Sequence, residues 1–296
     1  MAKKGREARI MRTITKIRGD TMSEALKRRA ASNKKKNGIT AGGASGGAHG
    51  ADDGAGVSRW RKKKDKAKIR VEARGTSDAP HGYHGGMKVL CVGDGNMSFA
   101  LALATVCGNE GTNLVVTTKE SLGLARKIYG DACDATVEAL EACGATVHFG
   151  VECETLRARA KTLQETASGS AGAFDRIVFN FPDAGVGKVG PLSVQAQREL
   201  LASFFENAPS LLKGSGEMHV ALQTGPPYAG WNIEGVGAKC GVVLKTVVEF
   251  EASDFPGYEY CHTATEDEED EIEPRADDIE CECATYIFVK GAGAST

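Results

Sequence analysis

From Met87 onward the chain alternates short apolar runs with helical patterns, and this alternation most restricts the possible fold. Five runs have the character of buried strands: 88–93, 112–118, 145–151, 174–181 and 217–224. Four segments between them have helical patterns: 98–106, 122–143 with a break near Gly130, 155–166, and 193–212, which Pro209 should end early. Such alternation predicts a parallel sheet with helices on both faces.

The end of the chain departs from this alternation. A sixth strand is expected at 242–250, followed by an acidic segment with no obvious helix and a final strand at 284–290. Two strands joined by a loop pair antiparallel, which predicts a terminal hairpin at the sheet edge. We therefore expect one α/β domain at 87–290, interrupted by a disordered acidic loop at 265–282.

The first part of the chain has a different composition. Residues 1–86 carry 22 of the 37 Lys and Arg residues but only 8 of the 39 Asp and Glu residues. Two basic runs, 27–36 and 59–68, flank a Gly- and Ala-rich linker at 41–56. We predict a disordered basic tail at 1–80 that contacts RNA phosphates or acts as a nuclear or nucleolar signal. An alternative is a solvated tail that serves only import.

A glycine turn follows the first expected strand, and acidic residues follow the first three. Gly93 and Gly95 allow close backbone approach at the carboxyl end of the sheet, where ligands bind in such folds. Serine replaces the third glycine of a dinucleotide fingerprint, which favours S-adenosylmethionine over a nicotinamide cofactor. Glu120 could bind the ribose hydroxyls and Glu152 could reach the adenine side. The predicted cofactor-binding residues are Gly93, Asp94, Gly95, Asn96, Ser98, Phe99, Glu120 and Glu152.

A short motif, Asn180-Phe181-Pro182-Asp183, follows the fourth expected strand. Proline restricts the backbone, and the asparagine amide offers both a donor and an acceptor. The motif resembles the Asn/Asp-Pro-Pro-aromatic box with which many nitrogen methyltransferases hold a planar target. These four residues are the predicted catalytic group, and a purely structural turn is the alternative.

Several longer motifs occur in a characteristic order: 92–104, 174–185, 197–222, 225–233 and 255–263. Together they resemble the large-subunit rRNA (uridine-N3)-methyltransferase-like domain, a family that includes the ferredoxin-fold anticodon-binding-domain-containing proteins. The resemblance implies a Rossmann-like, seven-stranded class I methyltransferase sheet, S-adenosylmethionine as cofactor, and methylation of a uridine in rRNA. The family usually has histidine where this chain has Asp183, and aspartate where it has Glu120.

The resemblance suggests how uridine N3 could be methylated. Asp183 could accept the N3 proton in a dry pocket, where desolvation makes a carboxylate a stronger base. Asn180 would orient the uracil edge, and Tyr228 and Trp231 could stack on a flipped base or simply pack in the core. His262 is a further candidate substrate-binding residue. The alternative is a non-catalytic nucleolar RNA-binding protein that retains the fold.

The remaining expectations concern the cellular setting. Nine cysteines without a CxxC pair predict free thiols in a reducing compartment and no metal site. The sequence also lacks an apolar stretch of membrane-spanning length. We expect a monomer whose partner is rRNA or a pre-ribosomal particle, located in the nucleus and nucleolus, with the cytoplasm as the alternative.

Overall fold

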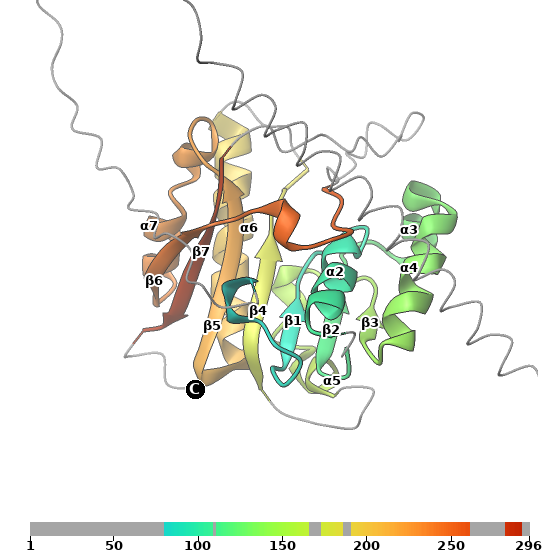
Figure 1. The fold of residues 1–296 in the computed structure, drawn as a ribbon. Helices are drawn as coiled ribbons and strands as arrows, with labels where there is room; N and C mark the ends of the chain where they lie inside the picture. Colours follow the sequence, from blue (N-terminus) through green and yellow to red (C-terminus); the bar gives the residue numbers. More distant parts are fainter. Residues whose placement is uncertain (1–79, 109–110, 166–172, 186–190, 261–281, 292–296) are drawn as a thin grey trace, which may run out of the picture.

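A seven-stranded mixed sheet forms the centre of the molecule (Figure 1). The computed structural model describes residues 80–108, 111–165, 173–185, 191–260 and 282–291. Almost all of the predicted basic tail and acidic loop, residues 1–79 and 265–281, therefore lies outside the described residues. The strands are β1 Val89–Cys91, β2 Leu114–Thr117, β3 Thr146–His148, β4 Phe174–Asn180, β5 Leu212–Gln223, β6 Val242–Glu249 and β7 Cys283–Lys290.

The strand order is β3-β2-β1-β4-β5-β7-β6. The first five of these strands are parallel to one another, and β7 runs antiparallel to both of its neighbours, β5 and β6. The predicted terminal hairpin is therefore present, with β6 outermost and β7 inserted beside β5. This arrangement confirms the expected class I methyltransferase sheet.

Helices cover both faces of the sheet (Figure 1). The helical elements are η1 Pro80–Gly82, α2 Ser98–Val106, α3 Leu122–Tyr129, α4 Asp131–Ala142, η2 Cys153–Thr155, α5 Ala160–Gln164, α6 Pro191–Asn207, η3 Ala208–Leu211, η4 Tyr228–Trp231, α7 Ile233–Lys239 and η5 Ala252–Asp254. The expected break at Gly130 separates α3 from α4. Pro209 lies in η3, where the long helix α6 has ended.

Two helical predictions differ from the structure. The expected helix at 155–166 is reduced to α5, because Thr155 closes a separate turn by donating from its Oγ1 to the Glu152 carbonyl at 2.9 Å. The short helix α7 was not predicted. It contains Gly235 and Gly237, which weaken a helical pattern, and Gly237 lets the helix approach the Phe288 ring.

The core has one layer on each side of the sheet. On one side, α6 buries Leu201, Phe204 and Phe205 against strand residues such as Ile177 and Met218. Each such side chain contributes about 2 kcal/mol by leaving water. On the other side, α2 and α4 pack on a second cluster that includes Val89, Cys91, Phe99, Leu103, Leu140 and Phe255.

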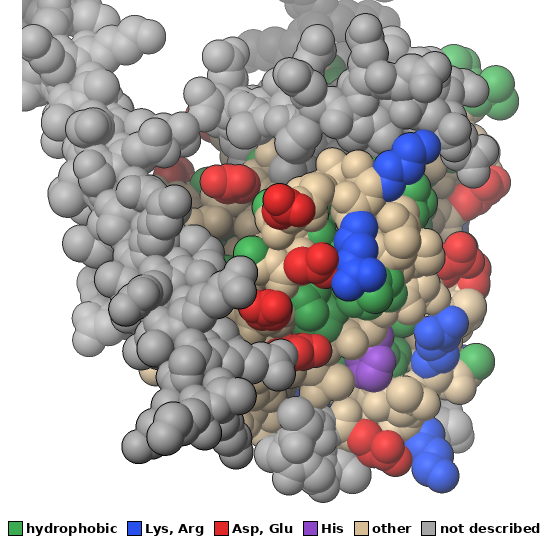
Figure 2. All heavy atoms as spheres, turned by 90° about the vertical axis from the view of Figure 1, so that its right-hand side faces the viewer, with side chains coloured by type: hydrophobic (Ala, Val, Ile, Leu, Met, Phe, Trp, Pro, Cys, Tyr) green, Lys and Arg blue, Asp and Glu red, His purple; other side chains and the backbone are tan. Residues whose placement is uncertain are grey.

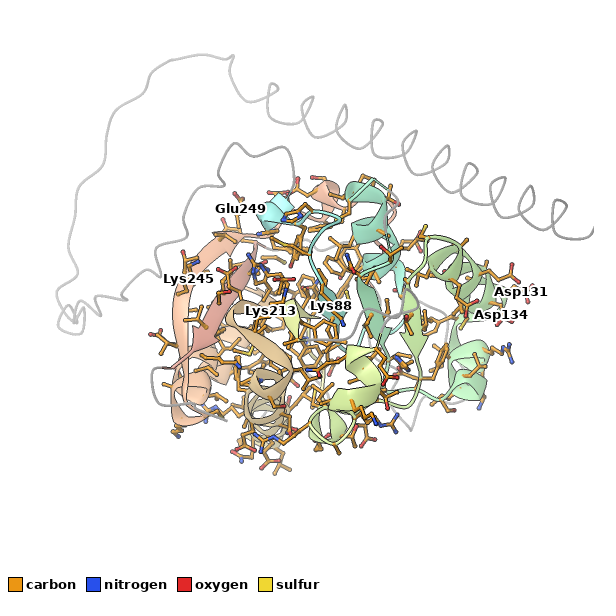
Figure 3. The ribbon with its side chains drawn as sticks, turned by 90° about the horizontal axis from the view of Figure 1, so that it is seen from below. Lys88, Asp131, Asp134, Lys213, Lys245 and Glu249 are labelled. Carbon is orange, nitrogen blue, oxygen red and sulfur yellow. The ribbon has the colours of Figure 1, made fainter. Side chains whose placement is uncertain are left out.

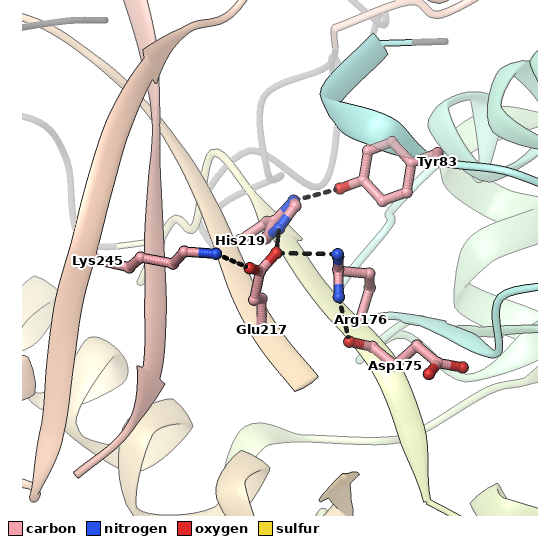
Figure 4. A network of polar contacts seen from close by, with 6 residues as sticks. All are labelled: Tyr83, Asp175, Arg176, Glu217, His219 and Lys245. Carbon is pink, nitrogen blue, oxygen red and sulfur yellow. Dashed lines mark hydrogen bonds and ion pairs between the residues drawn. The ribbon is translucent and has the colours of Figure 1, made fainter. Parts of the chain in front are cut away.

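A polar network crosses the second face of the sheet (Figure 4). Glu217 on β5 is at its centre: its Oε2 is 3.1 Å from Arg176 Nη2 and 3.3 Å from His219 Nε2, and its Oε1 accepts from Lys245. The Tyr83 hydroxyl lies 2.7 Å from His219 Nδ1. Tyr83 precedes the predicted domain at 87–290 yet is only 2% exposed, so it belongs to the packed core.

Two titratable groups in this network, Glu217 and His219, determine how it responds to pH. The hydrogen bond from His219 and the neighbouring Lys245 and Arg176 lower the pKa of Glu217 to about 2. Burial lowers the pKa of His219, although Glu217 opposes that shift. His219 is therefore neutral at pH 7, with Nε2–H donating to Glu217 and Nδ1 accepting from Tyr83.

Candidate functional site

A cavity of about 490 Å³ opens at the carboxyl ends of β1, β2 and β4. Its size lies within the range of small-molecule sites. Most of the predicted cofactor-binding and catalytic residues line it: Gly93, Asp94, Gly95, Asn96, Phe99, Glu120, Glu152, Asn180, Phe181, Pro182 and Asp183. Ser98 does not line it.

Both glycines of the turn make room for aromatic side chains. A Cβ at Gly93, which has φ 62°, would lie 2.9 Å from the Phe179 ring. A Cβ at Gly95 would lie 2.6 Å from the Tyr129 hydroxyl. Phe179 and Tyr129 also line the cavity, so the glycines shape its wall by admitting these two rings.

Asp94 lies between these glycines and bonds the first turn of helix α2. Its Oδ2 accepts from the Ala100 amide at 2.8 Å. Burial raises the pKa of Asp94 to about 6, while the Ala100 and Phe99 amides oppose the shift. The carboxylate thus changes its charge close to neutral pH inside the cavity wall.

Asn96 and Ser98 connect the glycine turn to the loop after η5. Asn96 Nδ2 donates to the Glu259 carbonyl at 2.9 Å, and the Ser98 hydroxyl accepts from the Glu259 amide at 3.0 Å. Phe99 supports the same loop, because its ring centroid lies 4.9 Å from that of Phe255. Asn96 and Phe99 therefore line the cavity and also support its wall, whereas Ser98 serves only as a support.

The acids after β2 and β3 differ in their exposure. Glu120 is only 7% exposed, and its Oε2 accepts from the Thr118 hydroxyl. Glu152 is exposed at the start of η2. Both reach the cavity from neighbouring strand ends, as the sequence predicted. Lys119 lies beside them and was not among the predicted residues.

The Asn180–Asp183 segment forms another wall of the cavity. Asn180 ends β4, and its Nδ2 is buried with no hydrogen-bond partner among the described residues. Phe181 has φ 49°, a left-handed conformation that costs of order 1–3 kcal/mol and is common at functional sites. Asp183 Oδ1 accepts from the Gly185 amide at 2.9 Å. The segment is therefore strained and presents an unpaired donor.

The predicted aromatic residues lie beside this cavity. Tyr228 and Trp231 line a small second pocket, and their ring centroids are 5.0 Å apart at an angle of 74°. Phe181, Pro182, Asp183 and Tyr260 line both pockets, so the two are contiguous. Trp231 is 6% exposed and also packs in the core. His262 lies outside the described residues.

Comparison with known proteins identifies the family. The family described as BMT5-like, rRNA (uridine-N3-)-methyltransferase BTM5-like, matches residues 90–262, which is more than half of the chain. The chain belongs to this family. The match includes the glycine turn, both acidic strand ends and the Asn180–Asp183 segment, and it ends at His262.

Relatives of the BMT5-like chain include proteins of different lengths. A heavy metal-associated isoprenylated plant protein 41 of Arabidopsis thaliana is 33% identical over 60% of this chain and 33% of its own length. An uncharacterized protein of the same plant is 32% identical over 70% of this chain and 95% of its own length. The 25S rRNA (uridine(2634)-N(3))-methyltransferase of Saccharomyces cerevisiae is 24% identical over 68% of this chain and 72% of its own length. The chain thus spans about a third of the first relative.

The BMT5-like fold implies S-adenosylmethionine, and the cavity fits this group. Seven acidic residues and one basic residue line the cavity, which suits a ligand with net positive charge. Asp94, Glu120 and Glu152 could hold its amino group and hydroxyls. The buried Asn180 Nδ2 lacks the acceptor that such a donor usually has, so a ligand or target oxygen could supply it.

One side face of the molecule is mixed in charge. The face over α3, α4 and β3 carries acidic and basic side chains, with several acidic ones gathered toward its left side (Figure 2). No continuous basic surface is visible on the described part of this face. No helix among the described residues is long and apolar enough to cross a membrane. All seven described cysteines are free thiols.

Besides Lys119, sequence reasoning missed two tyrosines and a glutamine of the site. Tyr129 contributes its hydroxyl from the end of α3, Tyr260 joins the two pockets, and Gln197 lines the second pocket from α6. Tyr260 lies in one of the resemblance motifs and Gln197 begins another, but neither motif assigns them a role. For Tyr129 the helical pattern gave no signal of a site.

Proposed function

We propose that this BMT5-like chain is an S-adenosylmethionine-dependent RNA methyltransferase that modifies N3 of a uridine in large-subunit rRNA. The single observation that carries the proposal is the unpaired, buried Nδ2 of Asn180 beside a strained Phe181 in the cavity wall. The name of the yeast relative supports the choice of uridine N3 as the target.

When bound, S-adenosylmethionine supplies a methyl group on a positively charged sulfur. The protein's contribution is then mainly positioning. Asn180 donates to a carbonyl of the uracil edge. Asp183 uses Oδ1 to accept from the Gly185 amide, and its Oδ2 makes no hydrogen bond within the described residues. That oxygen is the group that takes the N3 proton.

The target base is proposed to lie at the mouth of the second pocket, whose own volume of about 20 Å³ is too small to enclose it. Tyr228 and Trp231 provide aromatic surface next to Pro182 and Asp183. A base extruded from its stack gains contacts of this kind, which offset part of the cost of unstacking. Phe181 and Tyr260, shared by both pockets, lie between the base and the cofactor cavity.

The proposed partner is rRNA or a pre-ribosomal particle, and the proposed location is the nucleolus. The 22 Lys and Arg residues among residues 1–86 supply the phosphate contacts that the acidic cavity surroundings do not. Deleting residues 1–79 should leave cofactor affinity unchanged, weaken RNA binding and flatten its salt dependence. Unchanged RNA affinity and unchanged location of a tagged, truncated protein would remove this role of the tail.

The cofactor is tested by titrating the full chain with S-adenosylmethionine and separately with NADPH. We expect saturable binding of the first only, because the acidic lining repels a pyrophosphate. Gly95→Val should weaken binding at least about a hundredfold, since its side chain would displace the Tyr129 hydroxyl. Gly214→Val is the matched control, because a Cβ there meets no atom within 4 Å.

Catalysis is tested by methyl transfer to large-subunit rRNA, with the product nucleoside identified by mass spectrometry. Asn180→Ala should lower kcat about a hundredfold with little change in cofactor affinity. Asp183→Asn should lower the rate, because the amide cannot accept the N3 proton. Glu249→Gln, an exposed position on β6 that lines neither pocket, is the control (Figure 3).

A second candidate is a non-catalytic RNA-binding protein with the same fold. The residue that favours it is Asp183, at the position where the resembling family usually has histidine. Cofactor binding without methyl transfer to any rRNA, in the wild type and also in Asp183→His, would support this candidate over the enzyme.

A further inference from the structure

Gln197 on α6 is a polar side chain in a buried position, with only 3% of its surface exposed. Both ends of its amide are occupied. Its Nε2 donates to the Pro182 carbonyl, and its Oε1 accepts from the Ala184 amide at 2.8 Å. One side chain thus bonds the backbone on both sides of Asp183. Buried amides are usually paired, but pairing on both sides of one residue restricts that residue in particular.

The segment held in this way does not follow regular structure. β4 ends at Asn180, and the Phe181 amide donates to the Ala221 carbonyl at 2.9 Å. The left-handed Phe181 then turns the chain toward Pro182. A non-glycine residue in this conformation persists only where its surroundings hold it. Gln197 supplies the backbone hydrogen bonds at the next residues along the chain.

We propose that Gln197 is a positioning residue for methyl transfer, which rests on the function proposed above. Its amide fixes the Pro182–Ala184 backbone, and this backbone in turn fixes where Asn180 and Asp183 present their polar atoms. Small displacements of such groups slow a reaction that depends on alignment. Gln197 acts through the loop. Both ends of its amide already bond the protein backbone, so the amide is not available to contact the substrate.

Two substitutions separate the hydrogen bonds from the volume of the side chain. Gln197→Met keeps the length and removes both bonds. Gln197→Glu keeps an acceptor for the Ala184 amide but places a carboxylate against the Pro182 carbonyl. Once protonated, that glutamic acid again offers one donor and one acceptor, as the native amide does. Burial favours protonation at a higher pH than in water.

We expect kcat for both variants to fall at least about tenfold at pH 8, with the Kd for S-adenosylmethionine within about twofold of wild type. As the pH falls toward 6, the ratio of Gln197→Glu activity to wild-type activity should recover, while Gln197→Met should not. The wild-type profile is the reference at each pH, because Asp183, Tyr228 and Tyr260 line the same pocket. Glu206→Gln, an exposed position on the same helix that lines neither pocket, is the control.

A measurement without catalysis distinguishes failure of this inference from failure of the proposed function. Hydrogen exchange of the Ala184 amide should be slow in the wild type and at least about tenfold faster in Gln197→Met. Equal exchange rates of the Ala184 amide in both proteins would show that Gln197 does not hold this backbone. Faster exchange with unchanged kcat would overturn the positioning role. A wild type that binds S-adenosylmethionine but transfers no methyl group would remove the function and the positioning role with it.

Discussion

Two regions of the sheet, the middle of β5 and the carboxyl end of β4, differ in how their polar groups are paired. Toward the middle of β5, Glu217 and His219 have partners on every polar atom of their side chains, from Tyr83, Arg176 and Lys245, and only Arg176 Nε of this network lacks one among the described residues (Figure 4). At the carboxyl end of β4, Asn180 keeps a buried donor that has no partner within the described part of the chain. Paired groups stabilise the fold, whereas an unpaired buried donor costs stability until a ligand meets it.

The two regions also respond to pH with opposite signs. Glu217 has a lowered pKa, so its contribution to stability is present above about pH 4.5 and is lost toward pH 2. The lowered pKa of His219 likewise makes stability fall below about pH 6.5. Asp94 has a raised pKa of about 6, so it destabilises the protein above that pH and ceases to do so near pH 4.

The largest expected effect comes from removing the centre of the paired region. Glu217→Ala leaves Arg176 and His219 without their carboxylate, and Glu217 itself is only 12% exposed. The free energy of unfolding should fall by about 4 kcal/mol, measured by urea denaturation at pH 7. Affinity for S-adenosylmethionine should not change in the folded fraction. The exposed Glu249 on β6 provides the control, Glu249→Ala (Figure 3).

The next effect is expected in the cavity wall and has the opposite sign. Asp94→Asn removes a buried charge while retaining an oxygen for the Ala100 amide. At pH 8 the free protein should gain up to about 3 kcal/mol of unfolding free energy, with the gain shrinking toward pH 4. The same variant should bind S-adenosylmethionine more weakly. A loss of stability at pH 8 would show that the Asp94 charge supports the fold.

The smallest effect tests a single bond of the network. Tyr83→Phe removes the hydroxyl that lies 2.7 Å from His219 Nδ1 but keeps the ring packed among Phe255 and its neighbours. Stability should fall by about 1 kcal/mol, measured as a lower midpoint in urea. Methyl transfer should be unaffected, because Tyr83 does not line the cavity. A tenfold loss of activity would contradict the separation of the two regions.

The sequence was sufficient to predict the order of the strands and of the longer helices, but not α7, because apolar periodicity records burial directly. The face of α6 formed by Leu201, Phe204 and Phe205 is fully buried, as its spacing required. The start of β5 at Leu212 could not be predicted, since the following Lys213, Gly214 and Ser215 are exposed and have no strand pattern. The boundary is set by the pairing of Leu212 with Phe174, the first residue of β4.

The lining of the cavity was predictable where it depends on the ends of strands, as for Asp94, Glu120 and Asn180. Residues that act across the fold gave no local signal. Gln197 lies 15 residues after Pro182 in the chain. It is buried beside Pro182 only because α6 packs against the end of β4. The Tyr129 hydroxyl reaches Gly95 from another helix. Such pairs depend on tertiary packing, which a pattern along one segment does not contain.

The position of β7 has a consequence for synthesis. β7 lies between β5 and β6, yet its residues, Cys283–Lys290, follow those of all the other described strands in the chain. Until they emerge from the ribosome, β5 lacks a neighbour on one side and β6 has no strand to pair with. The nascent chain therefore exposes an open sheet edge at least while residues 250–282 are being translated. The insertion of β7 between β5 and β6 then closes this edge.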